Sequence, residues 1–121
     1  MRVKYAGPRP GGASHQGVDA LSVGREYTVL EISTLADRPS YFRIEVVNGE
    51  PPALFDVRLF DLTSPMIPQN WTGSLDESGL LTIGPKAWRE RDFWEAYLER
   101  REWAVTVYER ERTAILSART E

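Results

Sequence analysis

The chain has 121 residues, of which 41% are apolar and 27% charged, a composition typical of one folded domain, 1–121, rather than of a disordered segment. The net charge of −3 excludes the strongly basic surface that nucleic-acid binding usually requires, so we expect no nucleic-acid partner. The absence of cysteine excludes disulfides and thiolate metal sites.

The sequence contains nothing that indicates export or membrane insertion. Residues 1–5 are polar and alternating, without the apolar core of a signal peptide. No apolar run approaches the roughly 20 residues that a membrane-spanning helix needs. We therefore expect a cytoplasmic protein with no membrane partner.

Short strands are predicted in the first third of the chain. Apolar and charged residues alternate over 1–5, and β-branched and aromatic residues dominate 21–33, so each segment is predicted to contain a strand. Between them, residues 7–17 include four glycines and two prolines and are predicted to form a flexible loop.

The middle of the chain is predicted to form a hairpin. Residues 41–47 alternate as a strand does, and Asn48-Gly49 is a strong turn signal that should return the chain toward 53–63. In this returning segment, apolar and polar residues alternate as in a strand, but some apolar residues also have the spacing of a helix. We favour an extended segment with a bulge or a short turn near Asp56.

A second pair of short strands, 71–75 and 80–83, is predicted on either side of the turn 76–79. Pro85 then suits the first position of a helix, and one or two helical turns are predicted over 85–91.

Two further helices are predicted near the C-terminal end. Asp92 is a candidate N-cap, with Glu95 three residues later as in a capping box, and aromatic residues then recur at helical spacing. Residues 102–116 alternate like a strand at their start but have the length and charge pattern of a helix, which we favour. A polar tail, 117–121, follows.

The order of strands first and helices afterwards indicates an α+β fold. The strands are short and closely spaced, which favours a small, strongly bent antiparallel sheet, with an SH3-like barrel as one possible form. The C-terminal helices are predicted to pack on this sheet. The residues that we expect in the structural core are Tyr27, Phe42, Phe55, Trp71, Trp88, Phe93, Trp94 and Tyr97.

The sequence contains no motif for catalysis, a metal or a cofactor. The glycines of 7–17 match neither the phosphate-loop nor the dinucleotide pattern, and His15 lies in that loop without partner ligands. Asp56 interrupts an apolar segment, so its carboxylate either caps a turn or faces a partner. We expect no catalytic residue, no metal and no cofactor.

Aromatic residues beside arginines predict a protein-binding surface. Four tryptophans are many for this length, and large aromatic side chains often dominate interfaces. Packing in the core is favoured over partner binding for Trp88 and Trp94. For Trp103 the two roles are equally favoured. Residues 1–85 hold ten acidic and seven basic groups, an excess of acid that would steer a basic partner. The candidate partner-binding residues are Glu26, Glu31, Glu45, Asp56, Asp61 and Trp103.

A resemblance to known proteins covers about residues 21–100. It rests on the segments LSVGREYTVLEIS, PALFDVRLFDL, IPQNW, IGPKAW and DFWEAY, of which GPKAW and FWEAY are the most distinctive. These segments are similar to those of small bacterial proteins of mostly unassigned function, some of which resemble the immunity proteins encoded beside polymorphic toxins. The resemblance implies tight binding to a cognate toxin. It assigns no contact residues, because immunity surfaces diverge together with their toxins.

Three functions are therefore compared. The first is a non-catalytic protein-binding domain that blocks another protein, such as a toxin domain. The second is a small carboxylate-dependent hydrolase centred on Asp56, which requires a concave site with a carboxyl group of raised pKa. The third is an SH3-like adaptor or regulatory domain, or a domain associated with nucleic acid. The partner, the binding face and the oligomeric state are left open by the sequence.

Overall fold

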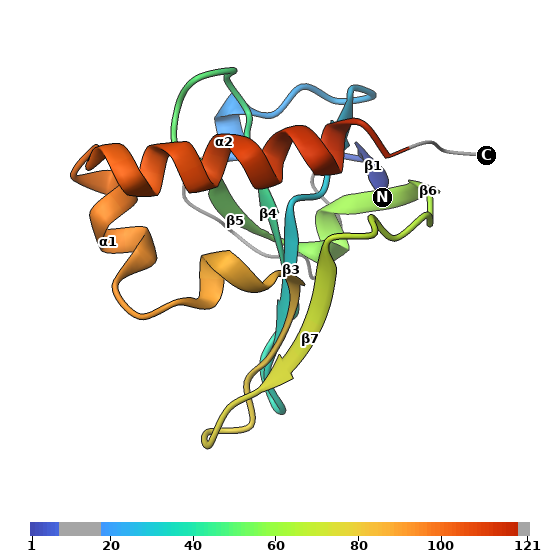
Figure 1. Ribbon diagram of the computed structural model, residues 1–121. Helices are drawn as coiled ribbons and strands as arrows, with labels where there is room; N and C mark the ends of the chain where they lie inside the picture. The colour runs from blue at the N-terminus through green and yellow to red at the C-terminus, as the bar shows by residue number, and fades with distance from the viewer. Residues whose placement is uncertain (8–17, 119–121) are drawn as a thin grey trace.

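The computed structural model describes residues 1–7 and 18–118 (Figure 1). The strands are β1 (Arg2–Tyr5), β2 (Glu26–Thr28), β3 (Glu31–Thr34), β4 (Tyr41–Ile44), β5 (Ala53–Asp56), β6 (Phe60–Ser64), β7 (Trp71–Leu75) and β8 (Leu81–Pro85). The helical elements are the short 3-10 turns η1 (Val18–Ala20), η2 (Val57–Leu59) and η3 (Lys86–Arg89), then α1 (Phe93–Leu98) and α2 (Glu102–Leu116). The α+β class is confirmed. The predicted loop at 7–17, with His15, lies outside the described residues apart from Gly7.

The strands form two antiparallel sheets. The smaller has the order β2-β1-β6, and the larger has the order β5-β4-β3-β8-β7. The SH3-like barrel that we considered is not formed, because the two sheets do not close on each other. The strand expected within 21–33 is divided between them: β2 ends at Thr28, β3 begins at Glu31, and the chain changes sheets at Val29 and Leu30, both buried.

Two glycines close the predicted hairpins. β4 pairs with β5, and Gly49 in the turn between them has a φ of 90°. β7 pairs with β8, and Gly79 in their turn has a φ of 88°. Positive φ angles are easily reached only by glycine, so both turns follow from the local sequence. In Figure 1, the strand β7 and the turn after it extend away from the helices.

The two sheets share one aromatic core. Phe42 and Phe55 are cross-strand partners on β4 and β5, and the ring of Phe60 on β6 lies 5.9 Å and 6.4 Å from their rings. The ring of Tyr5 on β1 also lies 5.9 Å from the ring of Phe60. Phe60 therefore joins the smaller sheet to the larger one.

The start of α1 differs from the prediction. Asp92 does precede the helix, but its backbone is left-handed, with a φ of 64°, and its side chain makes no capping hydrogen bond. A capping residue needs an extended backbone to turn its side chain toward the helix, so the expected capping box does not form. By contrast, the helix favoured for residues 102–116 is confirmed as α2, which buries Ala104, Tyr108 and Ile115.

Aromatic rings join η3, α1 and α2 to one another. Trp88 of η3 stacks on Tyr108 of α2 at 5.2 Å between centroids, and Tyr97 of α1 lies 4.3 Å from Tyr108. The expected core residues Tyr27, Phe55, Trp71, Trp88, Phe93 and Tyr97 are buried, and Phe42 and Trp94 are half-buried against them. In residues 1–7 and 18–118, no helix combines the length and the apolar character that crossing a membrane demands.

Candidate functional site

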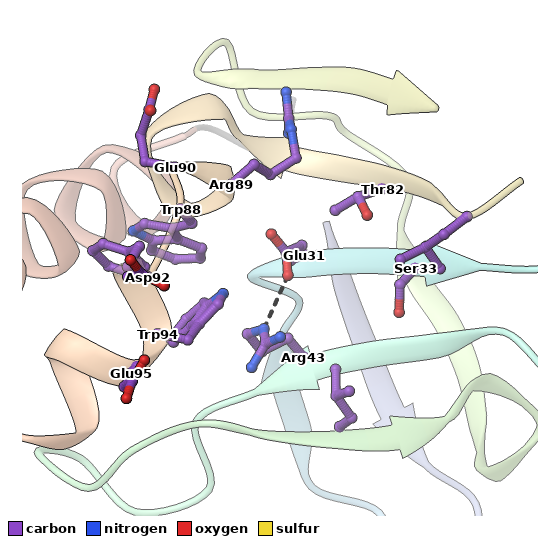
Figure 2. A pocket seen from close by; sticks show the side chains of 13 residues that line it. Glu31, Ser33, Arg43, Thr82, Trp88, Arg89, Glu90, Asp92, Trp94 and Glu95 are labelled. Atoms are coloured by element: carbon purple, nitrogen blue, oxygen red, sulfur yellow. Dashed lines mark hydrogen bonds and ion pairs between the residues drawn. The ribbon is translucent and has the colours of Figure 1, made fainter. Parts of the chain in front are cut away.

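A groove of about 450 Å³ lies between the larger sheet and the segment formed by η3 and α1 (Figure 2). The strand register supplies its floor: Glu31 of β3 is opposite Arg43 of β4, and Ser33 of β3 is opposite Thr82 of β8. Because alternate residues of a strand share a face, these side chains lie on the same side of the sheet. Trp88 and Trp94 form the aromatic wall opposite the floor, and Phe93 also lines the site. We call this site the sheet groove.

An ion pair between a buried carboxylate and a half-buried arginine lies on the floor of the sheet groove. Glu31 is only 4% exposed, and its Oε1 accepts a hydrogen bond from Nε of Arg43 at 3.0 Å. The Arg43 guanidinium in turn lies 4.0 Å from the ring centroid of Trp94, which is a cation–π contact. Arg43 therefore connects a carboxylate on the sheet to an aromatic residue of α1.

The environment of Glu31 makes its carboxyl group harder to ionise. Burial raises its pKa above the ordinary value, and the positive charges of Arg43 and Arg89 oppose this effect without cancelling it. The side chain folds closely over Gly84 of β8, where an added Cβ would lie 2.7 Å from Cγ of Glu31. Gly84 thus makes room for a buried acid on the sheet.

Arg89 joins η3 to the strands β7 and β8 through hydrogen bonds. Its Nη1 donates hydrogen bonds to the carbonyl oxygens of Thr72 and Gly84 at 3.0 and 2.9 Å, and its Nη2 donates to the Thr72 hydroxyl. This guanidinium is therefore already engaged by β7 and β8. Its charge still acts on the sheet groove, which it lines.

The rim of the sheet groove is acidic. Glu90, Asp92 and Glu95 are exposed there, and together with Glu31 they oppose only Arg43 and Arg89, which leaves a formal charge of −2 on its lining. The only ion pair of these rim residues within the described chain joins Asp92 to Arg91 at 4.0 Å, between two exposed side chains. Such a pair contributes little, so the rim keeps its negative charge.

A second hollow, of about 290 Å³, lies on the other side of the same carboxylates. It is lined by Asp92, Glu95, Ala96, Glu99, Arg101 and Trp103, and we call it the Trp103 hollow. Trp103 is 49% exposed, with its ring edge-on to Phe93 at 6.1 Å. Asp92 and Glu95 line both sites, so one acidic strip along α1 lies between the sheet groove and a half-exposed tryptophan.

The structure brings only part of the predicted binding set together. Glu31 and Trp103 lie on opposite sides of the acidic strip, although Glu31 is buried rather than displayed. Asp61 is exposed on β6, and Glu26 is exposed on β2, 3.9 Å from Arg2. These two belong to the smaller sheet, so the predicted set does not form one surface.

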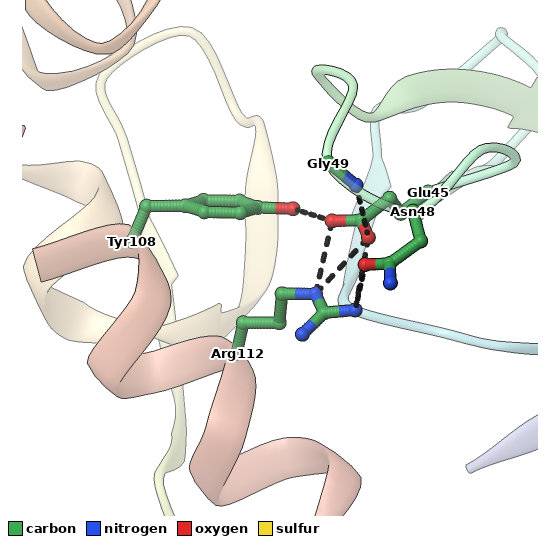
Figure 3. Close-up of polar contacts among 5 residues, drawn as sticks. All are labelled: Glu45, Asn48, Gly49, Tyr108 and Arg112. Atoms are coloured by element: carbon green, nitrogen blue, oxygen red, sulfur yellow. Dashed lines mark hydrogen bonds and ion pairs between the residues drawn. The ribbon is translucent and has the colours of Figure 1, made fainter. Parts of the chain in front are cut away.

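Glu45 holds α2 to the sheet. Its carboxylate accepts a hydrogen bond from the Tyr108 hydroxyl and two from Nε of Arg112, at 3.1 and 3.0 Å (Figure 3). Nη2 of Arg112 also donates to Asn48 at 3.0 Å. Because the Glu45 side chain is only 9% exposed and engaged on both oxygens, its role in the described structure is to position α2.

Asp56 caps a turn, which is one of the two roles expected for it. Its Oδ1 accepts the backbone N–H of Arg58 at 2.9 Å at the start of η2, and its Oδ2 pairs with the Arg58 guanidinium at 2.7 Å. The residue is 1% exposed. A carboxylate already engaged in this way provides no basis for a hydrolase centred on Asp56.

The acidic rim was missed at the sequence level. Residues 86–121 contain equal numbers of acidic and basic groups, so their net charge of zero gives no sign of the local group of carboxylates within 90–95. The signal that was present is the placement of Glu90, Asp92 and Glu95 around the two aromatic residues Phe93 and Trp94.

Comparisons with known proteins give no match among protein-family models, curated proteins or solved structures, so the function is argued from the fold and the site alone. The described residues contain no group of three or more side chains suited to hold a metal ion. The observations therefore define an α+β domain with an acidic, aromatic groove beside a short helix.

Proposed function

We propose that this protein is a protein-binding domain of the immunity type, which neutralises a toxin domain by direct contact. The observation that carries the proposal is the half-exposed Trp103 beside the carboxylates of α1. A tryptophan contributes a large contact area at a low entropic cost, and such residues often dominate the energy of an interface. The surrounding carboxylates select a basic partner and increase its association rate.

The arrangement suits blocking rather than catalysis. Neutralisation requires only that the partner's functional surface be covered, so a rigid anchor and complementary charge are enough. Trp103 packs on Phe93, which is itself buried, so the anchor is held in place before a partner arrives. Such preorganisation reduces the entropic cost of binding. The sequence resemblance to immunity proteins agrees with this function.

The experiment is co-expression with the product of the adjacent gene, followed by affinity capture and a growth-rescue assay. We expect a stable complex and restored growth. Trp103→Ala should weaken the complex by about thirtyfold, the effect of losing roughly 2 kcal/mol at an interface. Leu75→Ala is the matched control, because Leu75 is 71% exposed on β7, away from the helices. A failure to form the complex together with a failure to rescue growth would count against the immunity function.

A second candidate is an enzyme that uses Glu31 as its acid. The favouring observation is a carboxyl group of raised pKa in a concave site, which general acid catalysis requires. In this candidate the carboxylate of the hydrolase hypothesis is Glu31 instead of Asp56. Its test is hydrolysis of a panel of chromogenic esters and glycosides, with Glu31→Gln as the inactive variant. Turnover that is unchanged by Glu31→Gln would exclude it.

A further inference from the structure

The sheet groove combines an apolar wall with a charged floor. Trp94 is half-buried and supplies aromatic surface along which an aliphatic stem can lie, whereas Trp88 and Phe93 are each only 1% exposed. Glu31 is on the floor, and the rim carries further carboxylates. Long basic side chains match this division, because they pack their methylene groups on apolar surface and present a charge only at the end.

The floor carboxylate has capacity for one more donor. The Glu31 side chain is 5% exposed, and its Oε1 accepts from Arg43. In the part of the chain that the structure describes, no donor forms a hydrogen bond with Oε2. This oxygen is not among the described side-chain atoms that are fully buried and without a partner, so a cationic donor arriving from the groove can reach it and form a charge-assisted hydrogen bond. Figure 2 shows Glu31 between Arg43 on one side and Trp88 and Arg89 on the other.

The charges of the sheet groove favour a cation despite its two arginines. Arg43 is neutralised by Glu31 and covered by the Trp94 ring, and Arg89 is held by backbone carbonyls. Among the described residues, Glu90 and Glu95 form no ion pair. The net negative charge of the lining is therefore available to an incoming group.

We infer that the sheet groove receives a lysine or arginine side chain from a surface loop of the protein partner, with its stem against Trp94 and its charge between Glu31 and the rim carboxylates. The inference rests on the proposed protein-binding function and adds the position and chemistry of one contact. Trp103 and this bound cation would flank the acidic strip of α1, so the partner carries an apolar pocket and a basic residue side by side.

The site is tested first without the partner. The full chain, labelled with ¹⁵N, is titrated with acetyl-Gly-Lys-Gly-amide and with its arginine counterpart, and the indole N–H signals are followed by NMR. We expect a saturable shift of the Trp94 signal with both peptides. The norleucine peptide has a similar stem without the charge and should cause no comparable shift. An equal response to the norleucine peptide would overturn the inference.

Two variants locate the cation within the sheet groove. Glu31→Gln should weaken binding of the lysine peptide at least fivefold, whereas Glu77→Gln, in the exposed turn after β7, should not change it. Ser33→Lys provides a second variant at a half-buried position on the same face as Glu31, where its own ammonium would occupy the site. It should weaken peptide binding at least tenfold. Wild-type affinity in a folded Ser33→Lys variant would contradict the inference.

The partner assay separates this inference from the proposed function. We expect Ser33→Lys to lose capture of the adjacent gene's product as well as peptide binding. If it loses peptide binding but still captures the partner at wild-type affinity, the assignment of the groove to the partner's basic side chain fails and the protein-binding function stands. If the peptides bind but the wild-type chain captures no partner, the cation site stands and the proposed function fails.

Discussion

Gly84 leaves room for the Glu31 side chain of the neighbouring strand. A Cβ on residue 84 would lie 2.7 Å from Cγ and 3.1 Å from Cβ of Glu31, both near the root of that side chain. The acid cannot move aside by rotating its end alone. The glycine is therefore required by the neighbouring strand, since its own φ is not in the left-handed region.

Gly84→Ala should therefore destabilise the protein. We expect a loss of about 1–3 kcal/mol in the free energy of unfolding, the usual cost of overpacking a well-filled site. Gly73→Ala is the matched control, because nothing lies within 4 Å of a Cβ at that position on the adjacent strand β7. Urea unfolding of the three proteins measures both effects. Equal stability of the two variants would show that the Glu31 side chain shifts to admit the new Cβ without a loss of unfolding free energy.

The buried carboxyl of Glu31 makes stability depend on pH in a defined direction. Its folded pKa is raised above the ordinary value of 4.5, chiefly by burial, so the folded protein holds this proton to a higher pH than the unfolded chain does. The stabilisation from the protonated form is complete below the unfolded pKa and is lost as the pH rises through the folded pKa.

We expect the unfolding free energy of the wild type, relative to Glu31→Gln, to fall as the pH rises from about 4 toward 7, because glutamine does not titrate. Urea unfolding of both proteins across this range gives the difference directly. A difference that increases with pH would mean that Arg43 outweighs burial in setting the pKa of Glu31.

At the scale of elements, α2 is fixed to the sheet by aromatic packing and by one polar cluster. The Tyr108 ring stacks on Trp88, and its hydroxyl donates a hydrogen bond to Glu45, the residue directly after β4. Burial, followed by the hydrogen bond to Glu45, raises the pKa of Tyr108, so the phenol stays protonated and remains a donor. Arg112, one helical turn later, binds the same carboxylate. Two residues of one helix face thus set the position of α2.

Tyr108→Phe should weaken this attachment while keeping the ring. We expect a loss of about 1.5–3 kcal/mol in unfolding free energy, the range for a hydrogen bond to a charged group. Tyr97→Phe is the control from the neighbouring helix, because the Tyr97 hydroxyl makes no hydrogen bond with the described residues although its ring is equally buried. Thermal unfolding followed by circular dichroism compares the two. A smaller loss for Tyr108→Phe than for Tyr97→Phe would contradict the role of the cluster.

At the scale of the whole molecule, the two sheets depend on the same rings. Phe60 lies between Tyr5 of the smaller sheet and Phe42 and Phe55 of the larger one. The four tryptophans lie on β7, η3, α1 and α2, outside the smaller sheet. Tryptophan fluorescence therefore reports on one part of the molecule, whereas far-ultraviolet circular dichroism reports on both.

Phe60→Ala should destabilise both sheets together. We expect a loss of about 3–5 kcal/mol, as for other buried Phe truncations, and one common transition midpoint for fluorescence and circular dichroism. Coincident midpoints would show that the shared core makes unfolding cooperative. If the fluorescence midpoint kept its wild-type value while the dichroism midpoint fell, the two sheets would unfold independently.

Local patterns in the sequence determined the α+β class, the Asn48-Gly49 hairpin, the turn at 76–79 and the helix at 102–116, because each depends on residues close together in the chain. Tertiary structure alone decided the division of 21–33 between two sheets and the burial of Glu31 against Arg43, twelve residues away. It also decided that Asp56, for which turn capping was one of two expected roles, is buried, and that Asp92 leaves α1 uncapped. Strand pairing and burial arise from contacts between distant residues, and no local pattern specifies which acid will be covered and which will be displayed.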